Sequence, residues 1–181
     1  MSLEVLETSA DQVVLPIGVE VPWGEWRQGN ESDILYTSDA EECIAIAVFD
    51  PIKRLGYMAH ILAREQSQDE ILLPFTTAIL KNCEGDAERL SICLAGGRLD
   101  EDSITHYGAA LNRRNRVVKT FEKIGIPDPW HIEWDEEFIP QNLELDCSTG
   151  DYRLTRVKRA PFRSTAGYTQ PQLEKETHNN V

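Results

Sequence analysis

Cys43 and His60 are the two residues of this chain whose types and spacing could support nucleophilic chemistry. A thiol becomes a strong nucleophile when it loses its proton, and a neighbouring imidazole can take that proton and later deliver it to a leaving amine. Thr37 could hold the imidazole in one tautomer through its hydroxyl or carbonyl, as the third member of a triad does. These residues predict thiol attack on an amide, with the backbone N–H of Cys43 as the expected oxyanion donor.

The same residues also have an ordinary structural interpretation. Cysteine, alanine and isoleucine are common in buried strands, and a histidine that follows Met58 and Ala59 can belong to a core. The cysteines of the chain are Cys43, Cys83, Cys93 and Cys147. None forms a Cys-x-x-Cys pair or has a histidine at ligand spacing, so we expect free thiols, no metal site and no cofactor.

Two apolar runs place Cys43 close to His60. Residues 43–49 form a continuous apolar stretch that ends at a turn, and residues 55–62 form a second one. Because few residues separate them, the runs predict an antiparallel hairpin. With the turn centred between Pro51 and Ile52, Cys43 and His60 are direct cross-strand partners, with Cβ atoms ~4.5 to 5.5 Å apart. This proximity predicts a thiolate–imidazolium pair and a lowered thiol pKa.

The remaining elements predict a layered α/β fold. Strands are expected over residues 33–37, 89–95, 130–134, 142–147 and 151–157, with a weaker one within 13–21. Helices are expected over residues 74–83 and from a start between 103 and 112 to Gly125. The expected architecture is an α+β-like layered sandwich, with a mixed, mostly antiparallel sheet and two to three helices. We expect a polar leader (1–12), one domain (13–160) and a flexible tail (161–181).

Composition favours a soluble protein whose partner is a basic or neutral protein surface rather than nucleic acid. The 181 residues are 41% hydrophobic and 27% charged, and the formal net charge of -13 would repel a nucleic-acid backbone. No stretch approaches the ~20 apolar residues that a membrane-spanning helix needs. The acidic N-terminus does not have the pattern of a secretory signal, so we expect a cytoplasmic location.

Several other features favour structural roles. Gly96-Gly97 reads as a tight strand exit, because no lysine and no third glycine follow at phosphate-loop spacing. The basic cluster Arg113, Arg114 and Arg116 reads as a solvated helix face, with a docking patch for an acidic partner as the alternative. The tryptophans, Trp23, Trp26, Trp130 and Trp134, read as packing residues. No role is assigned to His106, His131 or His178.

The order and spacing of the three candidate residues are distinctive. Thr37 precedes Cys43 by six residues, and His60 follows Cys43 by seventeen, within the stretches 43–51 and 55–62. Further matching positions are Tyr36, Gly24-Glu25-Trp26, Ala95-Gly96-Gly97, Asn115 and Thr149-Gly150. This pattern resembles the CheD family of chemoreceptor glutamine deamidases over roughly residues 19 to 158.

The resemblance implies a fold, an activity and partners. The fold would be an α/β layered sandwich shared with certain bacterial deamidating toxins. Cys43 would be the nucleophile, His60 the general base and acid, and Thr37 the residue that orients His60. The reaction would convert a glutamine side chain of a protein to glutamate through a thioester, with loss of ammonia. The substrates would be chemoreceptors, and a CheC-type phosphatase would be a regulatory partner.

Two departures from the family pattern leave alternatives open. The loop before Cys43, residues 38–42, contains Glu41 and Glu42 where the family has a Gly-Ser-containing loop, and carboxylates near a thiol oppose its ionisation. Residues 134–141 also lack the glycine-glycine and glycine-arginine pairs of the family. The chain could therefore be a catalytically degenerate CheD-like binding or regulatory module, or a cysteine hydrolase of small amides or peptides.

Overall fold

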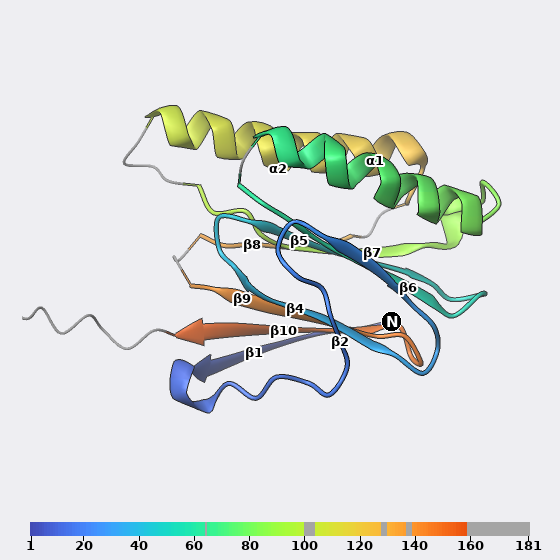
Figure 1. The fold of residues 1–181 in the computed structure, drawn as a ribbon, viewed down its shortest axis with the longest axis horizontal. Coiled ribbons are helices and arrows are strands. Elements are labelled where there is room, and N and C mark those ends of the chain that lie inside the picture. The colour runs from blue at the N-terminus through green and yellow to red at the C-terminus, as the bar shows by residue number, and fades with distance from the viewer. Residues whose placement is uncertain (64, 100–103, 128–129, 137–138, 159–181) are drawn as a thin grey trace, which may run out of the picture.

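The computed structural model describes residues 1–63, 65–99, 104–127, 130–136 and 139–158, which form three stacked layers (Figure 1). Two five-stranded sheets lie face to face, and two helices cover the outward face of one of them. The sheet beside the helices, with the order β3-β6-β5-β7-β8, is called the inner sheet. The outer sheet has the order β1-β10-β9-β4-β2. The predicted mixed α/β sandwich is confirmed.

The strands are mostly antiparallel to their neighbours. The inner sheet contains β3 (Trp26–Gly29), β5 (Ile44–Asp50), β6 (Leu55–Ile61), β7 (Ser91–Gly96) and β8 (His131–Trp134). The outer sheet contains β1 (Leu3–Ser9), β2 (Val19–Glu20), β4 (Ile34–Ala40), β9 (Gln141–Asp146) and β10 (Asp151–Lys158). The helices are α1 (Glu65–Asn82) and α2 (Ile104–Ile124), and short 3-10 turns are η1 (Ala10–Gln12) and η2 (Ala87–Arg89). The parallel pairs are β1 with β10, β2 with β4, and β7 with β8.

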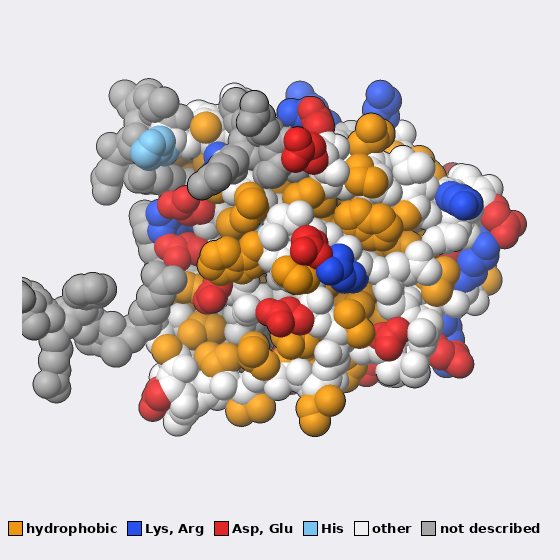
Figure 2. Space-filling view, in the orientation of Figure 1, with side chains coloured by type: hydrophobic (Ala, Val, Ile, Leu, Met, Phe, Trp, Pro, Cys, Tyr) orange, Lys and Arg blue, Asp and Glu red, His pale blue; other side chains and the backbone are white. Residues whose placement is uncertain are grey.

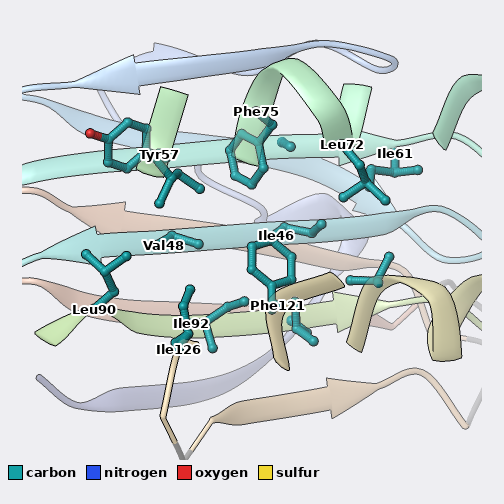
Figure 3. Close-up of a cluster of buried hydrophobic side chains, with 14 of the residues drawn as sticks. Ile46, Val48, Tyr57, Ile61, Leu72, Phe75, Leu90, Ile92, Phe121 and Ile126 are labelled. Carbon is teal, nitrogen blue, oxygen red and sulfur yellow. The ribbon is translucent and has the colours of Figure 1, made fainter. Parts of the chain in front are cut away.

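The continuous apolar run of β5 is explained by burial on both faces. Ile44, Ile46 and Val48 belong to the core beneath the helices, whereas the alternate residues belong to the core between the two sheets. Figure 3 shows the first core, in which side chains of α1 and α2 lie over those of the inner sheet. The rings of Phe75 and Phe121 meet edge-on there, 6.3 Å apart. A strand with both faces covered needs apolar residues at every position, which makes it recognisable in the sequence.

The expected polar leader is wrong for most of its length, because residues 3–9 form strand β1. This strand pairs in parallel with β10, from Leu3 beside Tyr152 to Ser9 beside Lys158. Ion pairs of Glu4 with Arg153 and of Glu7 with Lys158 join the two strands. Opposite charges on paired strands stabilise an edge strand that has little apolar surface to bury. The expected tail at residues 161–181 lies outside the described residues.

Helix α1 begins nine residues before the predicted start, at Glu65 rather than Pro74. Ile71, Phe75 and Ile79 recur at helical spacing and are buried against the inner sheet. Pro74 lies inside the helix on its exposed side. The polar stretch 66–70 belongs to the first turns of α1.

Helix α2 agrees with its predicted limits, since it begins at Ile104 and ends just before Gly125, which has a φ of 86°. Its buried face carries Val117 and Phe121, whereas Leu111 is exposed. The strands expected over residues 142–147 and 151–157 are β9 and β10, which pair as an antiparallel hairpin. Within the described parts of the chain, neither helix is long and apolar enough to cross a lipid bilayer.

Candidate functional site

The candidate residues gather at one end of the sandwich, at the left of Figure 1, where the β4–β5 connection meets the ends of β6 and β7. Thr37 lies in β4 of the outer sheet, His60 lies in β6 of the inner sheet, and Cys43 lies just before β5. Thr37 and His60 face each other across the space between the sheets, with their side chains fully buried. The structure therefore brings together two chain segments that do not pair as strands.

The predicted register of the hairpin is wrong by two residues. His60 pairs with Ala45, not with Cys43, because the strands separate at the pair Asp50 and Leu55 and leave a four-residue turn. The Asp50 carboxylate holds this turn by accepting the N–H groups of Ile52 and Lys53, at 3.0 and 3.1 Å. Cys43 lies two residues before Ala45 and is therefore diagonal to His60 rather than opposite. Diagonal positions lie ~7 to 8 Å apart, within reach of an imidazole.

The hydrogen bonds of Thr37 assign the tautomer of His60. Its Oγ1 donates to the carbonyl of Val21 at 2.8 Å and lies 2.7 Å from Nδ1 of His60. A hydroxyl has one proton, so Nδ1 must carry a proton and donate it to Oγ1. Nε2 of His60 is then a proton acceptor, and it has no hydrogen-bond partner within the described parts of the chain. Burial lowers the pKa of His60 to about 4, so the imidazole is neutral at pH 7.

The segment that precedes β3 holds His60 from the solvent side. The N–H of Gly24 donates to the carbonyl of His60 at 2.9 Å, and the N–H of His60 donates to the carbonyl of Glu25 at 3.0 Å. The Trp23 ring lies 5.9 Å from the imidazole, and its indole N–H donates to the carbonyl of Ser38. Trp23 is 61% exposed and packs at the edge, against the imidazole of His60. The other tryptophans pack against the core beneath the helices: Trp26, Trp130 and Trp134.

The glycine pair after β7 holds the backbone of Cys43. The N–H of Gly97 donates to the carbonyl of Cys43 at 2.7 Å, and a Cβ on Gly96 would lie 2.3 Å from that carbonyl oxygen. Gln141 of the outer sheet accepts the N–H of Gly96 at 2.7 Å. Both glycines have positive φ values, which confirms the predicted strand exit. This exit fixes the position at which Cys43 enters β5.

Arg98 neutralises the acidic loop before Cys43. Its guanidinium pairs with the carboxylates of Glu41 and Glu42, and its N–H donates to the carbonyl of Glu41 at 2.8 Å. The loop is also held at Asp39, whose N–H donates to the side chain of Asn142 at 3.0 Å. The two carboxylates that distinguish this loop from the CheD pattern are therefore tied to one cation.

The thiol of Cys43 is held in its protonated form. Burial raises its pKa, and the charges of Glu42 and Glu41 add to this effect, whereas the N–H of Ala63 and the charge of Arg113 oppose it. The expected lowering of the thiol pKa by an imidazolium is therefore wrong. With the pKa of His60 lowered as well, the resting site contains a neutral thiol and a neutral imidazole.

A small cavity lies beside Cys43. Its volume is about 200 Å³, and its lining includes Glu42, Ala63, Arg98, His106 and Arg113. It is open to solvent and is lined by Glu42, which precedes Cys43 in the chain, and by Ala63, whose backbone N–H bonds to the Cys43 thiol. A polar side chain in this cavity would meet residues that contact the thiol.

The basic cluster of α2 does not form one surface. Arg114 is buried, donates to the carbonyls of Gly97 and Asp135, and lies 4.9 Å from the centre of the Trp134 ring. It therefore supports the strand exit near Cys43, and the prediction of a solvated face or docking patch is wrong for it. Arg116 pairs with Asp69 of α1 at the surface.

Cys43 differs from the other cysteines in exposure. It is partly exposed, whereas Cys83, Cys93 and Cys147 are buried free thiols. Burial raises the pKa of Cys147 to about 12 and raises that of Cys93 as well. Among the described residues, no group of three or more His, Cys, Asp or Glu side chains is placed to hold a metal ion. Cys43 is the thiol that a reagent or substrate can reach.

Four groups of the site were not found from the sequence: the carbonyl of Val21 and the side chains of Trp23, Arg98 and Gln141. Val21 and Trp23 flank Pro22 in an irregular segment, where no periodicity indicates which atoms turn inward. Gln141 is a buried polar residue at the start of β9. The alternating pattern of the residues that follow it indicates the strand, but not that the strand begins with a buried glutamine. Arg98 follows the glycine pair, which was recognised as a turn only.

Comparison with known proteins leaves the family of this chain open. No protein-family model matches it, and no curated protein matches it. Among solved structures, the hypothetical protein YfiH of Bacillus licheniformis superposes with a TM-score of 0.44 and 12% sequence identity, over 71% of this chain. The chain spans 62% of the length of that protein. A likeness this distant carries no argument about function.

Proposed function

We propose that this chain is a cysteine-dependent protein-glutamine deamidase, a divergent member of the CheD family. The observation that supports this most is the relay from the Val21 carbonyl through Thr37 to Nδ1 of His60. This relay leaves Nε2 as a proton acceptor at the end of the sandwich where Cys43 lies. A thiol, a base and a residue that orients the base are what acyl transfer from an amide requires.

The first half of the reaction forms a thioester. Nε2 of His60 takes the proton of the Cys43 thiol as the sulfur attacks the Cδ of a substrate glutamine. The tetrahedral intermediate collapses when Nε2 returns that proton to the amide nitrogen, and ammonia leaves. Because the thiol and the imidazole are both neutral at rest, proton transfer accompanies attack rather than preceding it.

The second half releases glutamate. Nε2 takes a proton from a water molecule as its oxygen attacks the thioester carbonyl, and the same nitrogen returns the proton to the leaving sulfur. The Thr37 hydroxyl accepts a hydrogen bond from the Nδ1–H group throughout. This bond keeps His60 in one tautomer and stabilises the imidazolium that forms in each half. In both halves Cys43 carries the acyl group and His60 carries the proton, so the proposal names no cofactor.

The proposal includes a cellular setting. The substrate would be a chemoreceptor-like protein, with a CheC-type phosphatase as a regulatory partner, and the protein would act in the cytoplasm. Its free thiols fit a reducing compartment, and its charge of -13 disfavours nucleic acid as a partner.

A second candidate function is a CheD-like binding or regulatory module without activity. It is favoured by the raised pKa of the Cys43 thiol and by the two carboxylates beside it. In this alternative the same surfaces hold a partner, but the sulfur does not attack.

Mass spectrometry of a candidate receptor distinguishes the two functions. Incubation with the wild-type protein should add about one dalton at each modified glutamine, because an amide becomes an acid. Cys43→Ala should abolish the gain, whereas Cys83→Ala, which removes a buried thiol elsewhere, should retain it. Binding of the receptor without any mass gain would favour the inactive module.

A further inference from the structure

An exposed apolar segment, residues 13–23, runs beside the outer sheet and ends next to His60 of the candidate site. Its large apolar side chains that face solvent are Val14, Leu15, Ile17, Val19 and Trp23. Val14 is 87% exposed and Ile17 is 99% exposed. Figure 2 shows hydrophobic side chains gathered on the face that this segment crosses. Clustered exposure of this kind marks a binding surface, whereas single exposed apolar residues do not.

The segment is tied directly to the candidate triad. Val19 pairs with Leu35 in the short parallel strand β2, and the carbonyl of Val21 accepts the hydroxyl of Thr37. The Trp23 ring covers the imidazole of His60. A hollow of about 310 Å³, lined in part by Val14, Leu15 and Thr37, lies between this segment and the outer sheet. The apolar segment therefore contacts the buried residues Thr37 and His60 directly, through the Val21 carbonyl and the Trp23 ring.

The charge around the segment selects the kind of partner. Residues 1–26 contain five carboxylates and neither lysine nor arginine. Glu4, Glu7 and Glu25 are already paired with Arg153, Lys158 and Arg27, whereas Asp11 and Glu20 form no ion pair within the described parts of the chain. Glu20, within the segment, is exposed, and so is Asp39, which follows the Ser38 carbonyl that Trp23 contacts. A partner with an apolar face and basic flanks complements this surface. A second copy of the chain, also at -13, would bring two acidic rims together.

We propose that residues 13–23 are the docking surface for a basic amphipathic segment of the protein substrate, which places its glutamine next to Cys43. This inference rests on the proposed function, because it names the substrate of that same site. Apolar side chains of the substrate lie on Val14, Ile17 and Trp23, and its lysines or arginines face the carboxylates around them. Docking also acts on the triad, since the segment supplies the carbonyl that orients the Thr37 hydroxyl.

The test measures binding separately from catalysis. The protein is the full chain carrying Cys43→Ala, and the probe is a labelled amphipathic peptide of about 18 residues with leucines on one face, lysines on the other and a central glutamine. Fluorescence anisotropy gives its Kd. Val14→Ser with Ile17→Ser should weaken binding by about tenfold or more. Leu73→Ser, which removes a 70% exposed apolar residue from α1, should leave the Kd unchanged.

The charge requirement has its own control. A twin peptide with glutamates in place of the lysines should bind at least about tenfold more weakly, and raising NaCl from about 50 to about 500 mM should weaken the lysine peptide. Equal binding of the two peptides, or no effect of the double serine variant, would overturn the proposal. Circular dichroism and thermal unfolding confirm that the exposed substitutions leave the fold intact.

Other occupants give distinct results that also overturn the proposal. A dimer in sedimentation that Val14→Ser with Ile17→Ser abolishes would assign the surface to a second copy. Flotation with phosphatidylcholine–phosphatidylserine vesicles, lost in the same variant, would assign it to a membrane. Failure of the proposed function gives another result. The lysine peptide would then bind to residues 13–23, but the wild-type chain would not add mass to the peptide. A mass gain unaffected by the double serine variant would overturn the docking surface alone.

Discussion

Oγ1 of Thr37 and Nδ1 of His60 lie 2.7 Å apart although the two residues belong to different sheets. This bond fixes the imidazole from behind, and Trp23 covers it from the solvent side. The side chain of Gln141 makes a second link between the sheets, to the N–H of Gly96. Both links lie at the end of the sandwich that contains Cys43, so the packing of the two sheets determines the geometry of the site.

Replacing Thr37 should separate orientation of His60 from substrate binding. Thr37→Val removes the acceptor for the Nδ1 proton and leaves the Val21 carbonyl unpaired, which should lower the free energy of unfolding by about 1 to 3 kcal/mol. Deamidation should show a fall in kcat of about 100-fold, with KM little changed. Thr37→Ser keeps the hydroxyl and should restore most of the activity. Similar losses in the valine and serine variants would contradict a role for this hydroxyl.

The lowered pKa of His60 predicts how stability depends on pH. The unfolded chain gains a proton at this histidine below pH 6.5, whereas the folded chain gains it only below about pH 4. The free energy of unfolding should therefore decrease as the pH falls from 6.5 to 4, by up to about 3 kcal/mol from this residue. The free energy of unfolding, measured with urea at each pH, should change less across this range in His60→Gln than in the wild type. The same change in both proteins would mean that the imidazole is not buried in its neutral form.

Alkylation of Cys43 tests whether its thiol is neutral at rest. Its pKa is raised, so the rate of labelling by iodoacetamide should rise about tenfold per pH unit between pH 7 and about 9. Peptide mapping should identify Cys43 as the first cysteine labelled, since the other three are buried. A rate that is already at its plateau near pH 7 would indicate a thiolate–imidazolium pair instead.

Arg98 should control the pKa of Cys43 through the acidic loop. Arg98→Gln leaves the carboxylates of Glu41 and Glu42 without their shared cation, which should raise the thiol pKa further. The alkylation rate of Cys43 at about pH 8 should fall about threefold or more. Arg116→Gln removes another arginine–carboxylate pair, at the surface of α2, and should leave the rate unchanged. Equal rates in the wild type and Arg98→Gln would show that burial alone sets the thiol pKa.

Gly96 and Gly108 form a matched pair for testing the support of Cys43. Gly96 has a φ of 78°, and a Cβ there would lie 2.3 Å from the carbonyl oxygen of Cys43. Gly96→Ala should therefore displace this backbone, destabilise the protein by more than about 1 kcal/mol and abolish deamidation. Gly108→Ala meets no atom within 4 Å in α2 and should stabilise the protein by about 0.5 to 1 kcal/mol. Normal activity of Gly96→Ala would show that the glycine pair does not support the site.

The sequence indicates the inner hairpin well, because a strand covered on both faces leaves an unbroken apolar run at residues 44–49. The register of that hairpin could not be predicted, since the Asp50 carboxylate stabilises a turn longer than the shortest one. Strand β1 was missed because its side chains are mostly exposed and its partner, β10, is far along the chain. Pairing over such a distance leaves no local pattern.

The candidate site was predictable in its residue types but not in its chemistry. Thr37 and His60 were predicted to interact, and the hydrogen bond agrees with this. The protonation states were wrong, because the pKa values of Cys43 and His60 depend on burial that a sequence does not reveal. The roles of Val21 and Trp23 depend on how an irregular segment lies across the sandwich, which hydrophobic periodicity does not describe.

The pairing of β4 with β9 also sets the moment at which the protein could first react. Thr37 lies opposite Leu143, and the support of Gly96 comes from Gln141, so the pocket is complete only after residues 141–146 have joined the outer sheet. During synthesis, Cys43 and His60 leave the ribosome about 80 to 100 residues earlier than this strand, at ≈ 5–20 residues per second. For those seconds the nascent chain carries its reactive groups without the geometry that would let them act on neighbouring proteins.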